Sequence, residues 1–213
     1  MTDRIERLTL NLKKRQLNAF YAENKAEACA KILDIIESHR TARSLSKDEV
    51  VISSGGSQTL KEIGIFDMLG EYFVHDPYAK PTPSEQHQAK RAALISDVFM
   101  MSSNAVCENG ELVNIDGNGN RLGALIFGPD KVIIVVGVNK IVKDKDEAME
   151  RIKSIACVKN ALRLSRKTPC ASTGKCAECL IPGNTICAHT VVTRYSTIPD
   201  RINVIIVNES LGF

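Results

Sequence analysis

The features that most constrain the fold are short, almost purely apolar runs in the second half of the chain. Ala124–Phe127 and Val132–Val136 are rich in strand-forming residues and are separated by Gly128-Pro129-Asp130. Near-continuous hydrophobicity predicts strands buried on both faces, as in a parallel or mixed sheet covered by helices. Further strands are expected at 50–52, 72–76, 98–101, 112–115, 191–194 and 202–207. Helical patterns lie between these strands, so the sequence predicts an α/β fold with a mainly parallel sheet flanked by helices.

The first 40 residues are expected to be helical. Apolar residues recur at a helical spacing over residues 4–21, which favours an amphipathic helix. Asn24 and Glu27 match a capping box, so a second helix is expected to run from there to about residue 38. Such helices usually pack as scaffold or at a subunit surface, and a homo-oligomer is therefore one expectation. At 213 residues the chain is expected to form one domain, residues 1–213, with an N-terminal helical segment at 1–40.

Charge and composition argue against two classes of partner. The net charge is +3, from 28 basic and 25 acidic residues, which is too small to indicate a nucleic-acid partner. No apolar run reaches the roughly 18 residues of a membrane span, so none is expected. The charged N-terminus lacks the apolar segment of a signal peptide, which predicts a cytoplasmic protein.

A glycine- and hydroxyl-rich turn at Ser53–Ser57 is the first candidate binding feature. It follows a predicted strand and precedes a helix that Ser57 can cap. Free backbone N–H groups at such a turn favour anions, so Gly55, Gly56 and Ser57 are candidate ligand-binding residues. A tight turn with a good helix cap explains the same residues without a ligand. The turn has neither the Walker A lysine nor the G-x-G-x-x-G pattern, so no nucleotide motif is present.

A second polar segment follows the predicted strand at 98–101. Glu108-Asn109-Gly110-Glu111 predicts a hairpin with a type I′ turn. The loop after the hairpin is crowded with carboxamide and carboxylate groups, and the candidate ligand contacts of the whole segment are Asn104, Asp116, Asn120 and Arg121. Arg121 would pair a ligand carboxylate in a bidentate manner, and Lys140 would add a second charge. Asn, Asp and Gly also dominate turns for local reasons, so turn chemistry is the alternative.

Four of the seven cysteines lie close together, at Cys170, Cys176, Cys179 and Cys187, within a cysteine-rich loop expected at 166–190. Cys176 and Cys179 are separated by two residues, so both sulfurs can reach one metal from a tight turn. Thiolate is a soft ligand, so the candidate cofactors are zinc or an iron–sulfur cluster. His189 is a candidate substitute for one cysteine ligand, and a structural role beside the predicted strand is the alternative. A loop of free thiols and one or two disulfides are the alternatives, although the odd number of cysteines argues against a disulfide framework.

Four stretches of the chain together carry a family resemblance. They are residues 54–64, 127–142, the cysteine segment and, most specifically, the segment Ser103–Arg121 that reads Ser-Asn-Ala-Val-Cys-Glu-Asn-Gly-Glu-Leu-Val-Asn-Ile-Asp-Gly-Asn-Gly-Asn-Arg. The sequence resembles the LUD-domain proteins, the lactate-utilisation family, in their short single-domain form. The resemblance covers nearly the whole chain.

The resemblance implies a fold similar to the superfamily of ribose-5-phosphate isomerase, glucosamine-6-phosphate deaminase and the CoA transferases. In that superfamily ligands lie at the carboxyl ends of parallel strands against a Gly/Ser-rich turn, which corresponds here to Gly55–Ser57. Glu108-Asn109-Gly110 is also similar to the Glu-Asn-Gly motif of class I CoA transferases, which makes Glu108 a candidate nucleophile. A hairpin turn explains Asn-Gly without any chemistry.

For function, the resemblance implies an accessory subunit in the oxidation of L-lactate or a similar small 2-hydroxy acid, with partner subunits that carry iron–sulfur clusters. A stand-alone isomerase or acyl transferase is the alternative, with Asp116 or Glu108 moving a proton. A non-catalytic binding module held together by zinc is a third interpretation. The sequence leaves open whether the chain is an enzyme.

Overall fold

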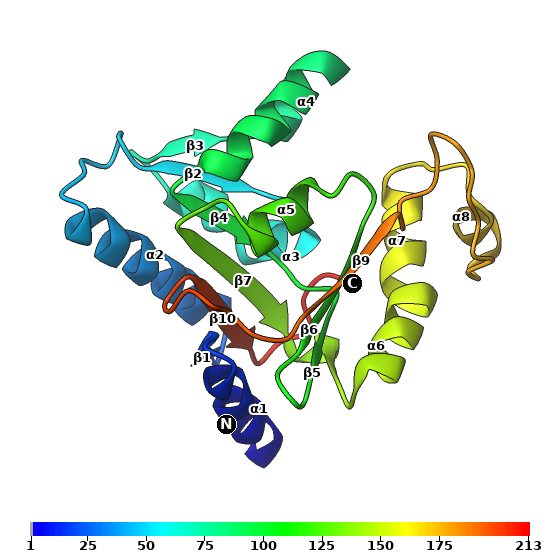
Figure 1. Cartoon of the computed structure of the whole chain (residues 1–213), viewed down its shortest axis with the longest axis horizontal. Coiled ribbons are helices and arrows are strands. Elements are labelled where there is room, and N and C mark those ends of the chain that lie inside the picture. The colour runs from blue at the N-terminus through cyan, green and yellow to red at the C-terminus, as the bar shows by residue number, and fades with distance from the viewer. Residues whose placement is uncertain (1) are drawn as a thin grey trace.

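Residues 2–213, described by a computed structural model, form two sheets with helices packed around them (Figure 1). The elements are α1 (Asp3–Lys14), β1 (Asn18–Ala22), α2 (Lys25–Ala42), β2 (Val51–Ser54), α3 (Gln58–Ile63), β3 (Phe73–His75), α4 (Pro83–Ala92), β4 (Val98–Met101), β5 (Ala105–Cys107), β6 (Leu112–Asp116), α5 (Asn120–Ile126), β7 (Lys131–Gly137), β8 (Ile141–Val142), α6 (Lys145–Arg151), α7 (Cys157–Arg163), α8 (Pro169–Thr173), β9 (His189–Thr193) and β10 (Ile202–Val207). A π-helical segment, Ile152–Ala156, joins α6 to α7.

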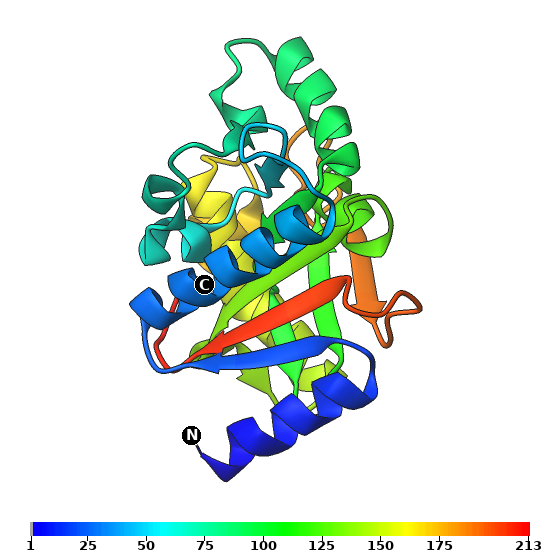
Figure 2. The same ribbon diagram turned by 90° about the vertical axis from the view of Figure 1, so that its left-hand side faces the viewer.

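The larger sheet has six strands in the order β1-β10-β7-β4-β2-β3, and every neighbouring pair is parallel. The predicted α/β class with a mainly parallel sheet is therefore confirmed. The central strands β7 and β10 are buried along almost their whole length, as their apolar sequences predict. One face of this sheet packs against α1, α5 and the second sheet, and the other packs against α2 and α3 (Figure 2).

The second sheet has four strands in the order β8-β5-β6-β9. The predicted hairpin is confirmed as β5–β6, but the prediction that its turn is of type I′ is wrong. Gly110 has a φ of +89°, whereas Asn109 is not among the residues with positive φ, and a type I′ turn needs both. The four residues Glu108–Glu111 join the two strands, and the Gly110 N–H donates to the Cys107 carbonyl at 2.7 Å.

Two expected elements have a different structure. The helix expected over 4–21 ends at Lys14, and Asn18–Ala22 forms the edge strand β1, because pairing with β10 satisfies its backbone. The strand expected at 124–127 is the end of helix α5. A short apolar run can be a buried strand or a buried helix, and periodicity alone does not separate them.

The strand order places a crevice at one end of the larger sheet. From β2 the chain adds β3 on one side, then returns to place β4 on the other side of β2 and β7 beyond it. The direction of winding therefore reverses between β2 and β4. In open α/β sheets ligands bind outside the carboxyl ends of the strands at such a reversal. None of the helices described within residues 2–213 is long and apolar enough to cross a bilayer.

Candidate functional site

A cleft of about 440 Å³ lies where the strand order reverses. We call it the strand-end cleft. Its walls come from the turn after β2, the segment after β4, the β6–α5 loop, the start of α7 and the cysteine-rich segment. The fold brings together seven of the eight predicted ligand-binding residues in its lining: Gly56, Ser57, Asn104, Asp116, Asn120, Arg121 and Lys140. The eighth, Gly55, lies beside it, since a Cβ there would be 3.0 Å from Arg121 Cδ. Their role in binding stays a prediction.

The charges of the strand-end cleft are predominantly positive. Among the described residues, its charged lining consists of one acid, Asp116, and five bases: Lys90, Arg121, Lys140, Arg163 and Arg166. A cleft lined by one sign of charge concentrates ligands of the opposite sign. The lining therefore favours an anionic ligand.

The Arg121 side chain donates hydrogen bonds to several segments of the cleft wall. Its Nη1 donates to the Ser102 carbonyl and to Asn114 Oδ1, each at 2.9 Å. Its Nη2 donates to Asn104 Oδ1 at 2.9 Å and to the Ile115 carbonyl at 2.7 Å. All four terminal N–H groups thus have protein acceptors, so the bidentate ligand contact expected of Arg121 would have to displace them. In this structure Arg121 connects α5 to the segment after β4 and to β6.

Lys140 is the cation best placed to meet a ligand. Its side chain is buried at the base of the cleft, where Nζ donates to Thr59 Oγ1 at 2.8 Å and to Ser102 Oγ at 2.9 Å. Within residues 2–213 no carboxylate oxygen lies within 4.0 Å of this nitrogen. Burial, followed by the charges of Arg151 and Arg121, lowers the pKa of Lys140 to about 7. An anion bound beside it would stabilise the ammonium form.

Asp116 is the acidic counterpart of Lys140. Its side chain is 14% exposed and lies at the end of β6, with Arg121 Nε 3.9 Å from Oδ2. That oxygen is buried and accepts no hydrogen bond from the described part of the chain. Buried polar atoms are rarely left without a partner, so Asp116 Oδ2 is suited to accept a hydrogen bond from a ligand.

The Gly/Ser-rich turn has a structural role in the cleft wall. The Gly55 N–H donates to the Met100 carbonyl at 3.0 Å, and the Gly56 N–H donates to the Tyr78 hydroxyl at 3.1 Å. Ser57 caps α3, as predicted, by accepting from the Leu60 N–H at 3.2 Å. Two of the N–H groups expected to hold an anion are therefore already engaged.

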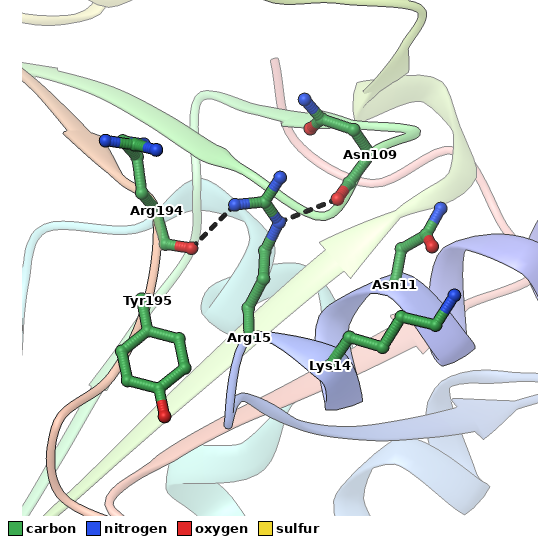
Figure 3. A pocket seen from close by; sticks show the side chains of 6 residues that line it. All are labelled: Asn11, Lys14, Arg15, Asn109, Arg194 and Tyr195. Carbon is green, nitrogen blue, oxygen red and sulfur yellow. Dashed lines mark hydrogen bonds between the residues drawn. The ribbon is translucent and has the colours of Figure 1, made fainter.

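Glu108 lies outside the strand-end cleft. Its carboxylate forms an ion pair with Arg4 Nε at 2.6 Å, at the tip of the β5–β6 hairpin. A shallow hollow of about 620 Å³ lies near this hairpin, lined by Asn11, Lys14, Arg15, Asn109, Arg194 and Tyr195 (Figure 3). Arg15 crosses it and donates to the carbonyls of Asn109 and Arg194, each at 2.7 Å. The hollow is thus a bridged surface between elements, and the strand-end cleft is the better candidate site.

Among the described residues that line the strand-end cleft, the cysteine-rich segment supplies Arg166, Gly183, Thr185 and Ile186 but none of its four clustered cysteines. Cys170 is buried, Cys176 is exposed, and Cys179 and Cys187 are partly buried. His189, at the start of β9, is exposed. All seven cysteines are free, and no three of their sulfurs lie within 4.8 Å of one another in the described chain. A metal at these cysteines stays a prediction.

Cys157 is a thiol that the sequence analysis missed. Its Sγ lies 3.3 Å from Cys187 Sγ, and the residue lines the strand-end cleft. This contact lowers the pKa of the Cys187 thiol to about 7 and raises the pKa of Cys157. Adjacent thiols of this kind suit a soft metal such as zinc or iron. No local spacing points to Cys157, because it comes from the preceding helix.

A separate group of metal-type side chains lies at the opposite end of the larger sheet. In the part of the chain that the structure describes, it is the only set of three such ligands within 4.8 Å: His39, Asp97 and Asp130. Arg43 forms an ion pair with Asp130, which already balances part of its negative charge. This group belongs to the packing of α2 against the amino ends of β4 and β7.

The family model of the LUD domain matches residues 5–207. The chain belongs to the LUD-domain family. The family relates the chain in general to lactate utilisation. Among solved structures, this LUD-domain chain is similar to a DUF162 family protein from Deinococcus radiodurans, with 17% sequence identity, a TM-score of 0.45, and coverage of 96% of this chain and 94% of that chain. Comparison with curated proteins gave no match.

Proposed function

We propose that this LUD-domain protein binds a small 2-hydroxy acid, such as L-lactate, in the strand-end cleft and supports its oxidation as an accessory subunit. One observation carries the proposal. Within residues 2–213, a buried ammonium with no carboxylate partner, on Lys140, and a buried carboxylate oxygen with no hydrogen-bond donor, on Asp116, line the same cleft. A 2-hydroxy acid has the two complementary groups, a carboxylate and a hydroxyl donor.

Each end of the ligand would have its own partner. The ligand carboxylate would pair with the Lys140 ammonium, and the hydroxyl would donate to Asp116 Oδ2. Arg121 would keep Asn104, Ser102 and the end of β6 in place around the ligand. Oxidation of the carbinol releases two electrons and two protons. Asp116 would accept the hydroxyl proton. The C–H hydrogen would leave with its electron pair to a two-electron acceptor in a partner subunit, which would pass the electrons to iron–sulfur clusters and the second proton to water.

The test is ligand binding by the isolated protein, measured by calorimetry with L-lactate, D-lactate, pyruvate and propionate. We expect L-lactate to bind more tightly than propionate, which has the carboxylate but lacks the hydroxyl. Lys140→Met should abolish binding of all four acids. Asp116→Asn should remove the preference for lactate over propionate, because the carboxamide is a weaker acceptor. Lys143→Met, on the surface outside the cleft, is the matched control.

Equal affinity for lactate and propionate in the wild-type protein would contradict the proposed role of Asp116. Retention of lactate binding by Lys140→Met would overturn the assignment of the cleft. The five basic residues also fit a phosphosugar, the substrate class of the isomerase alternative. A phosphosugar that binds more tightly than lactate, and is turned over unless Asp116 is replaced by Asn, would establish that alternative.

A further inference from the structure

We propose that Cys157 is a metal ligand, and that it forms, with Cys187 and Cys170, a thiolate site for zinc or iron in the wall of the strand-end cleft. The fourth ligand would come from the Cys176-x-x-Cys179 turn. The proposal deepens the proposed function, because the metal would lie beside the bound acid. The test measures metal binding alone, so the proposed metal site can be confirmed or overturned independently of lactate binding.

The spacing of the first two sulfurs carries the proposal. Cys157 Sγ and Cys187 Sγ are 3.3 Å apart, and both thiols are free. Two thiolates on one tetrahedral zinc, with bonds of about 2.3 Å, lie about 3.8 Å apart. A disulfide would require about 2.05 Å. Small outward shifts of the two side chains would therefore admit a shared metal.

Cys170 comes from a third segment, and its Sγ lies 3.3 Å from Thr168 Oγ1. It is buried in a small apolar cluster with Val158 and Ala161, and Ile186 packs against this cluster. Val158 follows Cys157 in the chain, and Ile186 precedes Cys187. The fold thus brings three cysteines from α7, α8 and the segment before β9 into neighbouring positions.

The remaining pair, Cys176 and Cys179, lies on a surface turn. Cys176 is exposed, and Cys179 Sγ has only a 4.0 Å contact with Thr185 Oγ1. The turn is held by a hydrogen bond from Thr185 Oγ1 to the Cys179 carbonyl and by an ion pair between Lys153 and Glu178. One of its thiols would have to move toward the other three to complete the site. With the turn in this position, no three sulfurs of the described residues lie within 4.8 Å of one another.

The backbone before Cys157 departs from regular helix. The π-helical segment Ile152–Ala156 ends directly before Cys157. A π-turn adds one residue and changes the direction in which the following side chains point, and such turns are frequent at functional sites. Before the π-turn, Arg151 donates to the carbonyls of Asn139 and Asn104. After it, Cys157 and Asn160 line the cleft.

The experiment is a Co²⁺ titration of the reduced full-length protein, purified without oxygen and freed of metal. Bound thiolates give a sulfur-to-cobalt charge-transfer band whose intensity increases with the number of thiolates. We expect one Co²⁺ per chain, and a band that Cys157→Ser reduces by about a quarter, the share of one ligand in a tetrahedral site. Metal affinity should fall by more than the roughly 10–100-fold cost of losing an outer-sphere contact.

Cys29→Ser is the matched control, since Cys29 is also buried and free but lies in α2, outside the cysteine cluster. It should leave the band unchanged. If Cys157→Ser does not fold, the wild-type protein still tests whether Cys157 binds metal. The measurement is the rate of Cys157 alkylation with Zn²⁺ compared with the rate without it. Protection of Cys157 by zinc would support the proposal. An unchanged cobalt band in Cys157→Ser, or no protection by zinc, would overturn it.

The metal content of protein purified anaerobically identifies the metal. Iron with acid-labile sulfide would assign a cluster able to pass electrons from the neighbouring ligand. Stoichiometric zinc would assign a site that fixes the cysteine segment to α7, because zinc has no redox chemistry. Lactate binding by metal-free protein, measured in parallel, separates failure of the metal site from failure of the cleft.

Discussion

At the scale of single residues, the cleft contains a buried cation, Lys140, and a partly buried one, Arg121, with different roles. Arg121 has four N–H groups committed to protein acceptors, so its charge organises the wall. Lys140 has two hydroxyl acceptors and keeps donor capacity for a ligand. Burial is the first cause that lowers the pKa of each of these groups. An arginine nevertheless stays charged, whereas a lysine with a pKa of about 7 changes charge near neutral pH.

Lys140 should therefore make both stability and binding depend on pH. Its folded pKa of about 7 lies below its ordinary value of 10.5, so the unfolded chain holds an additional proton between these values. The free energy of unfolding should rise with pH across this window, by up to about 1.4 kcal/mol per pH unit. Anion binding should weaken as pH rises through about 7, because the ammonium loses its proton.

Urea unfolding from pH 6 to about 10, compared between wild type and Lys140→Met, measures this contribution. Lys140→Met should remove the slope that Lys140 adds, whereas Lys143→Met should retain it. Identical pH profiles for wild type and Lys140→Met would show that the folded pKa of Lys140 is not depressed.

At the scale of elements, the β5–β6 hairpin and α1 depend on each other. Asn11 Nδ2 donates to the Glu108 carbonyl at 2.8 Å, and Arg15 donates to the Asn109 carbonyl at 2.7 Å. Gly110 lies against the same helix, where a Cβ would be 2.8 Å from the backbone of Asn11. The glycine is thus required for its positive φ and for the close approach of α1.

Gly110→Ala should destabilise the protein through both effects. A left-handed conformation costs a non-glycine residue about 1–2 kcal/mol, and overpacking against a backbone adds about 1–3 kcal/mol. Gly70→Ala is the control, because Gly70 also has a positive φ but no heavy atom of the described residues beyond its chain neighbours lies within 4 Å of its added Cβ. The difference between the two variants in urea unfolding isolates the clash with α1. Equal losses for both would mean that α1 does not pack closely on the hairpin.

At the scale of the whole molecule, the larger sheet separates two apolar cores. In β7, Ile134 belongs to the core shared with α1, α5 and the second sheet, and Ile133 belongs to the core shared with α2 and α3. Both side chains are fully buried. Each helical layer is therefore attached through its own set of contacts with the same central strand.

Ile133→Ala and Ile134→Ala should each lower the free energy of unfolding by about 2–5 kcal/mol, because each leaves a cavity in a packed core. Val192→Ala in β9, where the residue is 37% exposed, should cost less than about 1 kcal/mol. Urea denaturation gives the three values. A small loss for only one of the two isoleucines would show that its layer is loosely packed.

The sequence by itself determined the elements whose signal is local. Apolar composition was sufficient to predict the strands β7 and β10. A capping side chain predicted where α2 begins, at Asn24, and where α3 begins, at Ser57. The Asn-Gly pair predicted the position of the hairpin. It also identified the segments that supply Asp116, Arg121 and Lys140 to the cleft. These features depend on neighbouring residues, whose types are visible in the sequence.

Only the tertiary structure decided the features that depend on distant partners. Residues 18–22 are a strand because β10 pairs with them, and α5 is a helix because its apolar face packs on the larger sheet. Arg121 became an internal connector because acceptors from β6 and from the segment after β4 surround it. Cys157 joined the cysteine cluster because α7 passes beside Cys187. Each outcome depends on contacts between segments far apart in the chain, and spacing within one segment does not encode them.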